Sequence, residues 1–259
     1  MFHQTPIAMN SLFDLRDKVA VVTGGSTGLG AGISLGFAEA GADVLLVDRV
    51  PSAKTEQAIR ELGRRSHVVV ADLMRPESPR EIIKATIDTF GRIDVLVNNA
   101  GIIRRTPAAD FSETDWDEVM TINARSVFFM CQMAGREMLK QKRGKIINVA
   151  SLLSFQGGIL VPSYAASKAA VAQITKSLAN EWAQYGININ AIAPGYMATN
   201  NTKALREDAE RSKAILDRIP AGRWGLPEDL KGAAVFLASS ASDYVNGHVL
   251  VVDGGWLAR

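Results

Sequence analysis

Cysteine and histidine are scarce in this sequence, which argues against disulfides and zinc sites. The single cysteine, Cys131, lies in an apolar helical run, so we expect a buried thiol in a protein of a reducing compartment. The three histidines stand far apart, and neither HExxH nor CxxC occurs, so we predict no metal site. No apolar run approaches the roughly 18 residues that a transmembrane helix needs.

The charge and the start of the chain argue against further classes of protein. The sequence has 29 basic and 27 acidic side chains and a net charge of +2, which is small for a protein that binds nucleic acid through its charge. The N-terminus lacks a charged region followed by a long apolar stretch, so we predict no signal peptide. We assign no function to the residues before Asp14, and we expect a cytoplasmic protein without nucleic-acid or membrane partners.

Short apolar runs alternate with longer helical patterns along all 259 residues. The runs are apolar on both faces, as in a parallel sheet covered by helices, and the alternation indicates right-handed βαβ units. No linker or repeat divides the chain, so we predict one doubly wound α/β domain over residues 1–259. The predicted strands are 18–24, 43–48, 66–72, 93–101, 144–151, 186–195 and 248–255. The predicted helices are 29–39, 76–90, 113–140 and 162–184, and a polar segment at 200–220 belongs to an insertion that starts at about 195.

A glycine-rich turn follows the first predicted strand. Gly24, Gly28 and Gly30 form a GxxxGxG pattern between a strand and a helix, where the backbone can approach a pyrophosphate at the helix N-terminus. Asp48 ends the next strand and can accept hydrogen bonds from the adenosine ribose while repelling a 2′-phosphate. Arg49 weakens the expected preference for NAD over NADP, because an arginine at this position can pair with a 2′-phosphate. The pattern predicts a dinucleotide site that favours NAD, and the missing GK[ST] argues against a nucleoside-triphosphate site.

Polar residues and glycines also end most of the other predicted strands. Ligands of open parallel sheets bind beyond the carboxyl ends of the strands, so these residues are expected to meet at one edge. They are Gly24, Asp48, Asp72, Asn98 and Ser151, and Pro194 ends a further strand at the same edge.

Tyr164 and Lys168 are one helical turn apart and therefore share a helix face. A phenol with its ordinary pKa of about 10 is almost entirely protonated at neutral pH, and a nearby ammonium favours the phenolate. Such a pair also occurs on solvated helix faces, where it has no chemical role. With Ser151 at the same sheet edge, the pair becomes a candidate acid/base device.

The motifs "TGGSTGLG", "NNAG", "TINARS", "YAASK" and "PGYMAT", together with Ser151, resemble those of the short-chain dehydrogenase/reductase family over essentially the whole chain. The resemblance implies a Rossmann-type fold with a seven-stranded sheet, a nicotinamide cofactor and a homotetramer. It implies that Tyr164 is the acid/base, that Lys168 tunes it and binds the nicotinamide ribose, that Ser151 binds the substrate oxygen, and that Asn123 holds a proton-relay water. The implied cofactor site consists of Gly24, Ser26, Thr27, Gly28, Leu29, Gly30, Asp48, Arg49, Asp72, Leu73, Asn98, Ala100, Gly101, Tyr164, Lys168, Pro194, Gly195, Met197 and Thr199.

Further motifs, including "SLLSFQGGILVPSY", "APGYMATNNT" and "NNAGIIRR", resemble a sugar-acid group within that family. This implies reversible, NADH-dependent reduction of 2,5-diketo-3-deoxygluconate to 2-keto-3-deoxygluconate in the degradation of pectin-derived uronates. The candidate substrate residues are Arg104, Gln156, Tyr196 and Asn201. Arg104 would bind the carboxylate, although an arginine here also pairs with nearby acids in other members, and Arg105 could substitute for it.

The sequence leaves two alternative functions open. The first is a 3-oxoacyl-carrier-protein reductase or another sugar-alcohol dehydrogenase of the same family. A carrier-protein reductase usually prefers NADPH, which Asp48 opposes. The second is a dinucleotide sensor without turnover, against which the complete set of Ser151, Tyr164 and Lys168 argues.

Overall fold

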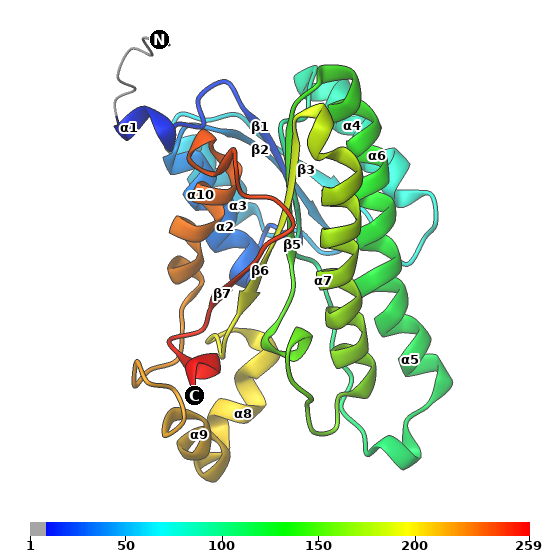
Figure 1. Ribbon diagram of the computed structural model, residues 1–259, viewed down its shortest axis with the longest axis vertical. Coiled ribbons are helices and arrows are strands. Elements are labelled where there is room, and N and C mark those ends of the chain that lie inside the picture. The colour runs from blue at the N-terminus through cyan, green and yellow to red at the C-terminus, as the bar shows by residue number, and fades with distance from the viewer. Residues whose placement is uncertain (1–8) are drawn as a thin grey trace.

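Seven parallel strands form the central sheet of this protein, in the order β3-β2-β1-β4-β5-β6-β7 (Figure 1). The structure is a computed structural model that describes residues 9–259. The order reverses between β1 and β4, the point at which open α/β sheets bind their ligands. The strands are β1 Val19–Thr23, β2 Asp43–Asp48, β3 Ser66–Val70, β4 Val95–Asn98, β5 Gly144–Val149, β6 Ile187–Pro194 and β7 Val249–Val252.

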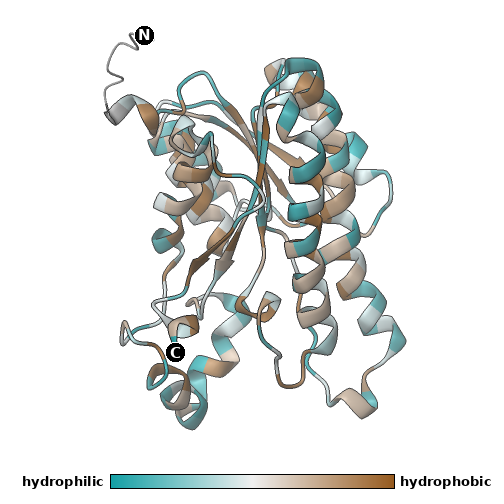
Figure 2. Ribbon diagram, viewed as in Figure 1, coloured by the Kyte–Doolittle hydropathy of each residue, from teal (hydrophilic) through white to brown (hydrophobic). Residues whose placement is uncertain are grey.

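Helices cover both faces of the sheet, so the central strands are buried on both sides (Figures 1 and 2). Alternate residues of β1 show this directly, because Val21 belongs to the apolar core under α4, α6 and α7, whereas Ala20 and Val22 belong to the core under α2 and α10. This explains why the strands lack an apolar/polar alternation. The helices are α1 Met9–Leu12, α2 Gly28–Glu39, α3 Ala53–Glu61, α4 Ser78–Phe90, α5 Glu113–Met120, α6 Ser126–Gln141, α7 Pro162–Trp182, α8 Lys203–Glu207, α9 Ala209–Leu216 and α10 Lys231–Ala238.

The predicted single sheet and all seven predicted strands are confirmed, but one predicted helix is wrong. The segment 113–140 contains α5 and α6, separated by a π-helical turn at Thr121–Arg125. Such turns are rare and concentrate at functional sites. The helix begins as its sequence suggests, because Ser112 caps α5 by accepting a hydrogen bond of 3.1 Å from the backbone of Asp115. The pattern of apolar residues continues through the turn and therefore does not reveal it.

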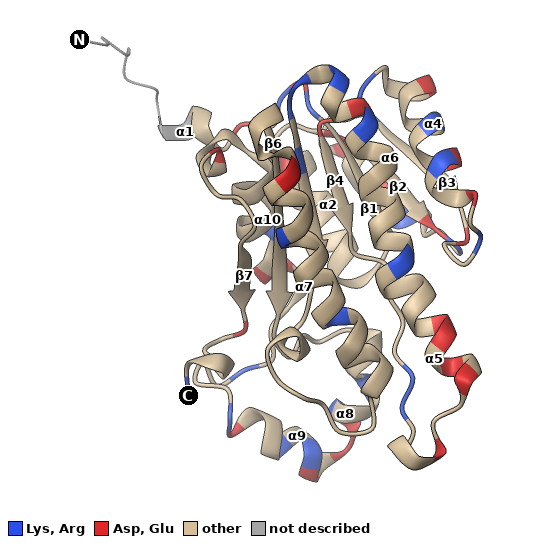
Figure 3. Cartoon of the chain, turned by 45° about the vertical axis from the view of Figure 1, so that its right-hand side comes forward, with Lys and Arg blue, Asp and Glu red and all other residues tan. Residues whose placement is uncertain are grey.

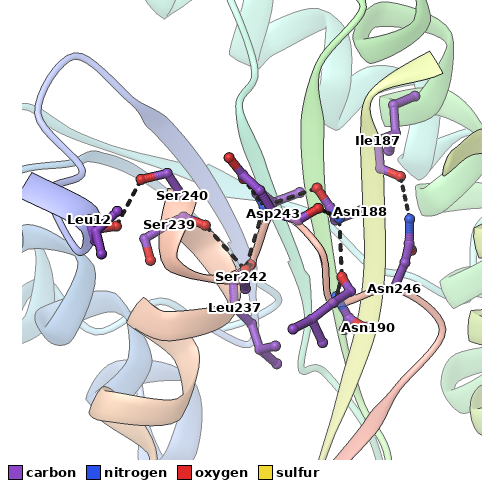
Figure 4. A network of polar contacts seen from close by, with 12 residues as sticks. Leu12, Ile187, Asn188, Asn190, Leu237, Ser239, Ser240, Ser242, Asp243 and Asn246 are labelled. Carbon is purple, nitrogen blue, oxygen red and sulfur yellow. Dashed lines mark hydrogen bonds and ion pairs between the residues drawn. The ribbon is translucent and has the colours of Figure 1, made fainter. Parts of the chain in front are cut away.

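Asparagine side chains close the amino end of β6 (Figure 4). Asn188 donates to the carbonyl oxygens of Asp243 and Val245 at 3.0 and 3.1 Å, and Asn190 donates to Val245 at 2.9 Å. In return, Asn246 donates to the carbonyl oxygen of Ile187 at 3.1 Å. These bonds fix the connection between α10 and β7, at the edge of the sheet opposite the carboxyl ends of the strands.

The predicted polar insertion consists of α8 and α9, which lie beyond the carboxyl end of β6 and carry many charged side chains (Figures 1 and 3). An apolar cluster of Leu152, Ile215, Ile219 and Trp256 connects α9 to the body of the protein. Every helix within residues 9–259 is too short or too polar to cross a membrane. The start of the N-terminal segment, to which the sequence assigns no function, lies outside the described residues.

Candidate active site

A cavity of about 500 Å³ lies at the carboxyl ends of the strands. Its walls come from the turn after β1, the ends of β2 and β3, the segment after β4, helix α7 and the loop after β6. The lining residues are Gly24, Thr27, Gly28, Leu29, Val47, Asp48, Arg49, Ala71, Asp72, Leu73, Asn99, Ala100, Gly101, Ile102, Ile122, Val149, Tyr164, Lys168, Ala198, Thr199, Asn200 and Asn201.

The glycine-rich turn has the geometry of a phosphate cradle. Gly24 and Gly28 have φ angles of +63° and +53°, in the left-handed region that favours glycine. A Cβ atom on Gly30 would lie 1.9 Å from the carbonyl oxygen of Gly24, so no side chain fits there. The N-cap of α2, Thr27, makes no side-chain capping bond. The turn and the uncapped helix N-terminus therefore fit the pyrophosphate of a dinucleotide.

Asp48 lies at the adjacent wall of this cavity. Its carboxylate accepts a hydrogen bond of 2.7 Å from the backbone N–H of Ser26, which fixes it beside the glycine-rich turn. Burial raises the pKa of Asp48, while the hydrogen bonds from Ser26 and Gly25 oppose that rise. Arg49 also lines the cavity and is exposed. An acidic and a basic residue therefore both line the part of the cavity next to the glycine-rich turn.

Tyr164, Lys168 and Ser151 converge at the other end of the cavity. Tyr164 and Lys168 project from α7, and the Nζ atom of Lys168 lies 5.6 Å from the centre of the Tyr164 ring. The ammonium donates a hydrogen bond of 2.6 Å to the carbonyl oxygen of Val149, the last residue of β5. Ser151 follows that strand and lies close enough to the Tyr164 hydroxyl to lower the pKa of the phenol. The predicted grouping of hydroxyl, phenol and ammonium is therefore present.

Burial is the largest influence on the pKa values of Tyr164 and Lys168. It raises the pKa of Tyr164, and the hydrogen bond from Ser151 and the charge of Arg105 offset part of this rise. Burial also lowers the pKa of Lys168 to about 8. Both effects have the same cause, because a site of low polarity disfavours phenolate and ammonium alike.

Asn123 occupies the π-helical turn and is completely buried. Its side-chain oxygen accepts from the backbone N–H of Ile102, and its amide donates to the carbonyl oxygen of the same residue, each at 2.9 Å. The amide also donates to Ser167 on α7 at 3.2 Å. Asn123 thus fastens the segment after β4 to α7, while its role in holding a relay water stays a prediction.

One predicted cofactor residue needs correction. The buried Asn98 side chain points away from the cavity and donates to the side chains of Asn148 and Cys131, at 2.9 and 3.2 Å. Its neighbour Asn99 lines the cavity instead and donates to the carbonyl oxygen of Gly24 at 3.0 Å. Successive residues of a strand face opposite sides, so only one of the two asparagines could face the site. The sequence signal for Asn99 was present in "NNAG".

Most of the remaining predicted cofactor residues line the cavity. Thirteen of the nineteen do so. Ser26, whose side chain is buried, and Gly30 belong to the glycine-rich turn but do not line the cavity. Pro194 belongs to β6. Gly195 and Met197 line a second cavity of about 190 Å³. Lining residues that the sequence reasoning missed, such as Ile102, Ile122 and Ala198, are mostly apolar and carry no chemical signal.

The four predicted substrate residues do not gather at one place. Arg104 pairs with Asp115 and Glu118 of α5, at 3.1 and 2.6 Å. The oxygen of Gln156 accepts a hydrogen bond of 3.3 Å from the indole of Trp256.

The other two differ in their relation to the cavity. Tyr196 packs against Trp224 and Trp256 with ring centres 5.7 and 4.6 Å away. Asn201 lines the main cavity. Of the four, only Asn201 is therefore part of its wall.

Comparison with known proteins places the chain among nicotinamide-dependent enzymes. Residues 24–257 match a family model described as enoyl-(acyl carrier protein) reductase. A 2-dehydro-3-deoxy-D-gluconate 5-dehydrogenase from Dickeya dadantii is 59% identical over 95% of this chain and 98% of that protein, and one from Escherichia coli is 58% identical over 96% and 99%. A crystal structure from Agrobacterium tumefaciens with bound NADP, called a 2-deoxy-D-gluconate 3-dehydrogenase, is 54% identical, covers 96% of this chain and 99% of that chain, and has a TM-score of 0.91.

Proposed function

This chain belongs to the short-chain dehydrogenase/reductase family, and on that premise we propose that it is an NAD(H)-dependent oxidoreductase of a sugar acid. The proposed reaction is the reversible reduction of 2,5-diketo-3-deoxygluconate to 2-keto-3-deoxygluconate. The observation that carries the proposal is the pair of Tyr164 and Lys168 in the wall of a cavity that also includes a phosphate cradle, with Ser151 next to Tyr164.

In the reduction, the chain's own residues polarise and protonate the carbonyl group. Ser151 donates a hydrogen bond to the substrate oxygen, which becomes more negative as the carbonyl is reduced. The Tyr164 hydroxyl then gives its proton to that oxygen, and takes it back in the reverse reaction. The cofactor supplies or accepts the hydride at the substrate carbon.

Lys168 would serve both the cofactor and the acid/base. Its ammonium is anchored to the carbonyl oxygen of Val149, which leaves its other two hydrogens for a ribose hydroxyl or a water. Its position beside the Tyr164 ring lets the positive charge favour the phenolate during alcohol oxidation. The pKa of Lys168, about 8, leaves most of the group charged at neutral pH.

We propose NAD(H) as the preferred cofactor because of Asp48. A half-buried carboxylate that is held by the backbone N–H of Ser26 at 2.7 Å cannot easily swing away from a 2′-phosphate. It would instead accept hydrogen bonds from the two ribose hydroxyls. The related Agrobacterium structure contains NADP. Kinetics with both cofactors are therefore the direct test.

The names of the relatives support the substrate class. Two proteins that are 58% and 59% identical over nearly their full lengths are 2-dehydro-3-deoxy-D-gluconate 5-dehydrogenases. We extend this activity to the present chain, together with a role in the breakdown of pectin-derived uronates. The homotetramer and the cytoplasmic location stay predictions.

A panel of substrates tests the proposed function. We expect rapid oxidation of NADH with 2,5-diketo-3-deoxygluconate and slow oxidation with a 3-oxoacyl group on a carrier protein. The 3-oxoacyl substrate is the rival that the sequence leaves open, and the matching family model is described as a reductase of another carrier-bound group, the enoyl group. A clear preference for the carrier-bound substrate would refute the sugar-acid assignment. Cofactor binding without any turnover would identify a sensor instead.

A further inference from the structure

Two consecutive arginines after β4 point to opposite sides of their segment. Arg104 pairs with Asp115 and Glu118 on α5. Arg105 donates a hydrogen bond of 3.1 Å to the carbonyl oxygen of Asn201, in the loop that leads to α8. In an extended segment, a shift of one residue reverses the direction of the side chain. One arginine therefore faces a helix, and the other faces the insertion over the cavity.

The two arginines differ in how their charges are neutralised. The guanidinium of Arg104 has two carboxylate partners, so its charge is already balanced. Arg105 forms no ion pair with any residue between 9 and 259, and its partner Asn201 offers only a neutral carbonyl oxygen. A guanidinium has five N–H donors, so one bond to Asn201 leaves most of them available.

Arg105 is also close to the acid/base. Its positive charge lowers the pKa of Tyr164, which places the guanidinium within electrostatic reach of the phenol. Its partner Asn201 lines the main cavity. Arg105 itself is exposed and does not line the cavity, so its bond to Asn201 is what places it beside the cavity wall.

The backbone around Arg105 is held at two points. Ile102 is bound by the buried amide of Asn123 through two hydrogen bonds of 2.9 Å. The backbone N–H of Thr106 donates to the carbonyl oxygen of Leu160 at 3.0 Å, in the loop before α7. The base of the arginine side chain is therefore positioned by the scaffold, as a specific binding residue requires.

We propose that Arg105, rather than Arg104, binds the carboxylate of the substrate and selects acids over neutral carbonyl compounds. The inference rests on the proposed function and names the residue that recognises its substrate class. The planar fork of a guanidinium suits a carboxylate, and the negative charge would balance a cation that has no acidic partner in the described chain. The bond from Arg105 to Asn201 would bring the bound acid and the α8–α9 insertion together.

The test compares acidic and neutral substrates in matched arginine variants. We would measure kcat and KM for 2,5-diketo-3-deoxygluconate and for diacetyl, a neutral diketone, in the wild type, Arg105→Ala, Arg105→Lys and Arg104→Ala. Arg136→Ala is the control, because this exposed arginine on α6 forms its one polar contact within residues 9–259 with the sulfur of Met133, and its loss changes the net charge equally. Inhibition of diacetyl reduction by 2-keto-3-deoxygluconate would report binding of the acid even without its turnover.

The proposal predicts a selective loss in one variant. Arg105→Ala should raise KM for the acid by about tenfold or more and weaken inhibition by the product acid similarly, as expected for a lost charged hydrogen bond. Its kinetics with diacetyl should change little, and Arg105→Lys should retain part of the affinity for acids. Equal losses on both substrates, or a selective loss in Arg104→Ala alone, would overturn the proposal. A wild type that is inhibited by the acid but never reduces the diketo acid would refute the proposed reaction instead.

Discussion

The ammonium of Lys168 donates a hydrogen bond of 2.6 Å to the carbonyl oxygen of Val149, in a site where burial lowers the pKa of the lysine to about 8. A free lysine has a pKa of 10.5, so the folded protein releases this proton at lower pH than the unfolded chain does. Between these two values the unfolded state binds more protons, and stability rises with pH. Below the lower value the destabilisation by the buried charge is fully present.

Lys168→Met should therefore change how stability depends on pH. We expect the free energy of unfolding of the wild type, relative to the variant, to increase by about 2 kcal/mol between roughly pH 7 and pH 9.5. Urea unfolding of both proteins at several pH values measures this difference. Lys176→Met, which removes an exposed lysine from the same helix, serves as the control and should give a constant difference. If the difference in unfolding free energy between the wild type and Lys168→Met were also independent of pH, burial would not destabilise the charged lysine.

Tyr164→Phe should remove the transferable proton with little change in volume. We expect kcat to fall by at least about a hundredfold, the usual scale of general acid/base catalysis. Cofactor binding, followed by fluorescence titration with NADH, should be preserved, since the ring and Lys168 remain. Turnover close to that of the wild type would show that another group supplies the proton.

Asp48→Ala should relax the choice of cofactor. The variant loses both the repulsion of a 2′-phosphate and the acceptor for the ribose hydroxyls, so the preference for NADH over NADPH should narrow by about tenfold or more. The measurement is kcat/KM with each cofactor in both proteins. Arg49→Ala is the matched comparison and should shift the preference in the opposite direction. A wild type that already favours NADPH would disprove our interpretation of Asp48.

Gly30→Ala should disrupt the cradle, because its Cβ atom would lie 1.9 Å from the carbonyl oxygen of Gly24. The turn must shift to accept the methyl group, so we expect cofactor affinity to fall at least tenfold and the melting temperature to drop. Gly232→Ala in α10 is the control, since nothing lies within 4 Å of its added Cβ. That variant should gain up to about 1 kcal/mol in stability, because alanine is the better helix former. Normal NADH binding by Gly30→Ala would mean that the turn is more adaptable than its geometry indicates.

The sequence by itself determined the sheet and the main elements of the site. Strands buried on both faces consist of continuous apolar runs, and a parallel sheet brings the residues at their carboxyl ends to one edge. Gly24, Asp48 and Ser151 are therefore assigned to one edge of the sheet by the sequence pattern, and the resemblance to a known family adds Tyr164. The spacing of Tyr164 and Lys168 also follows from the helix repeat alone.

Only the tertiary structure decided which of two adjacent polar residues faces the cavity. Asn98 and Asn99 are chemically identical, yet the side chain of Asn98 donates a hydrogen bond to Asn148 and that of Asn99 donates one to the carbonyl oxygen of Gly24. Arg104 and Arg105 differ in the same way, because carboxylates of α5 lie on one side of the segment and the insertion lies on the other.

The reason is geometric. The type of a residue shows what it can bind. The direction of its side chain depends on which side of the extended backbone the residue occupies and on partners that are distant in the chain. A one-residue change of phase exchanges the two sides of an extended segment. The sequence pattern also does not reveal the π-helical turn at Asn123, whose side chain is bound by the distant backbone of Ile102.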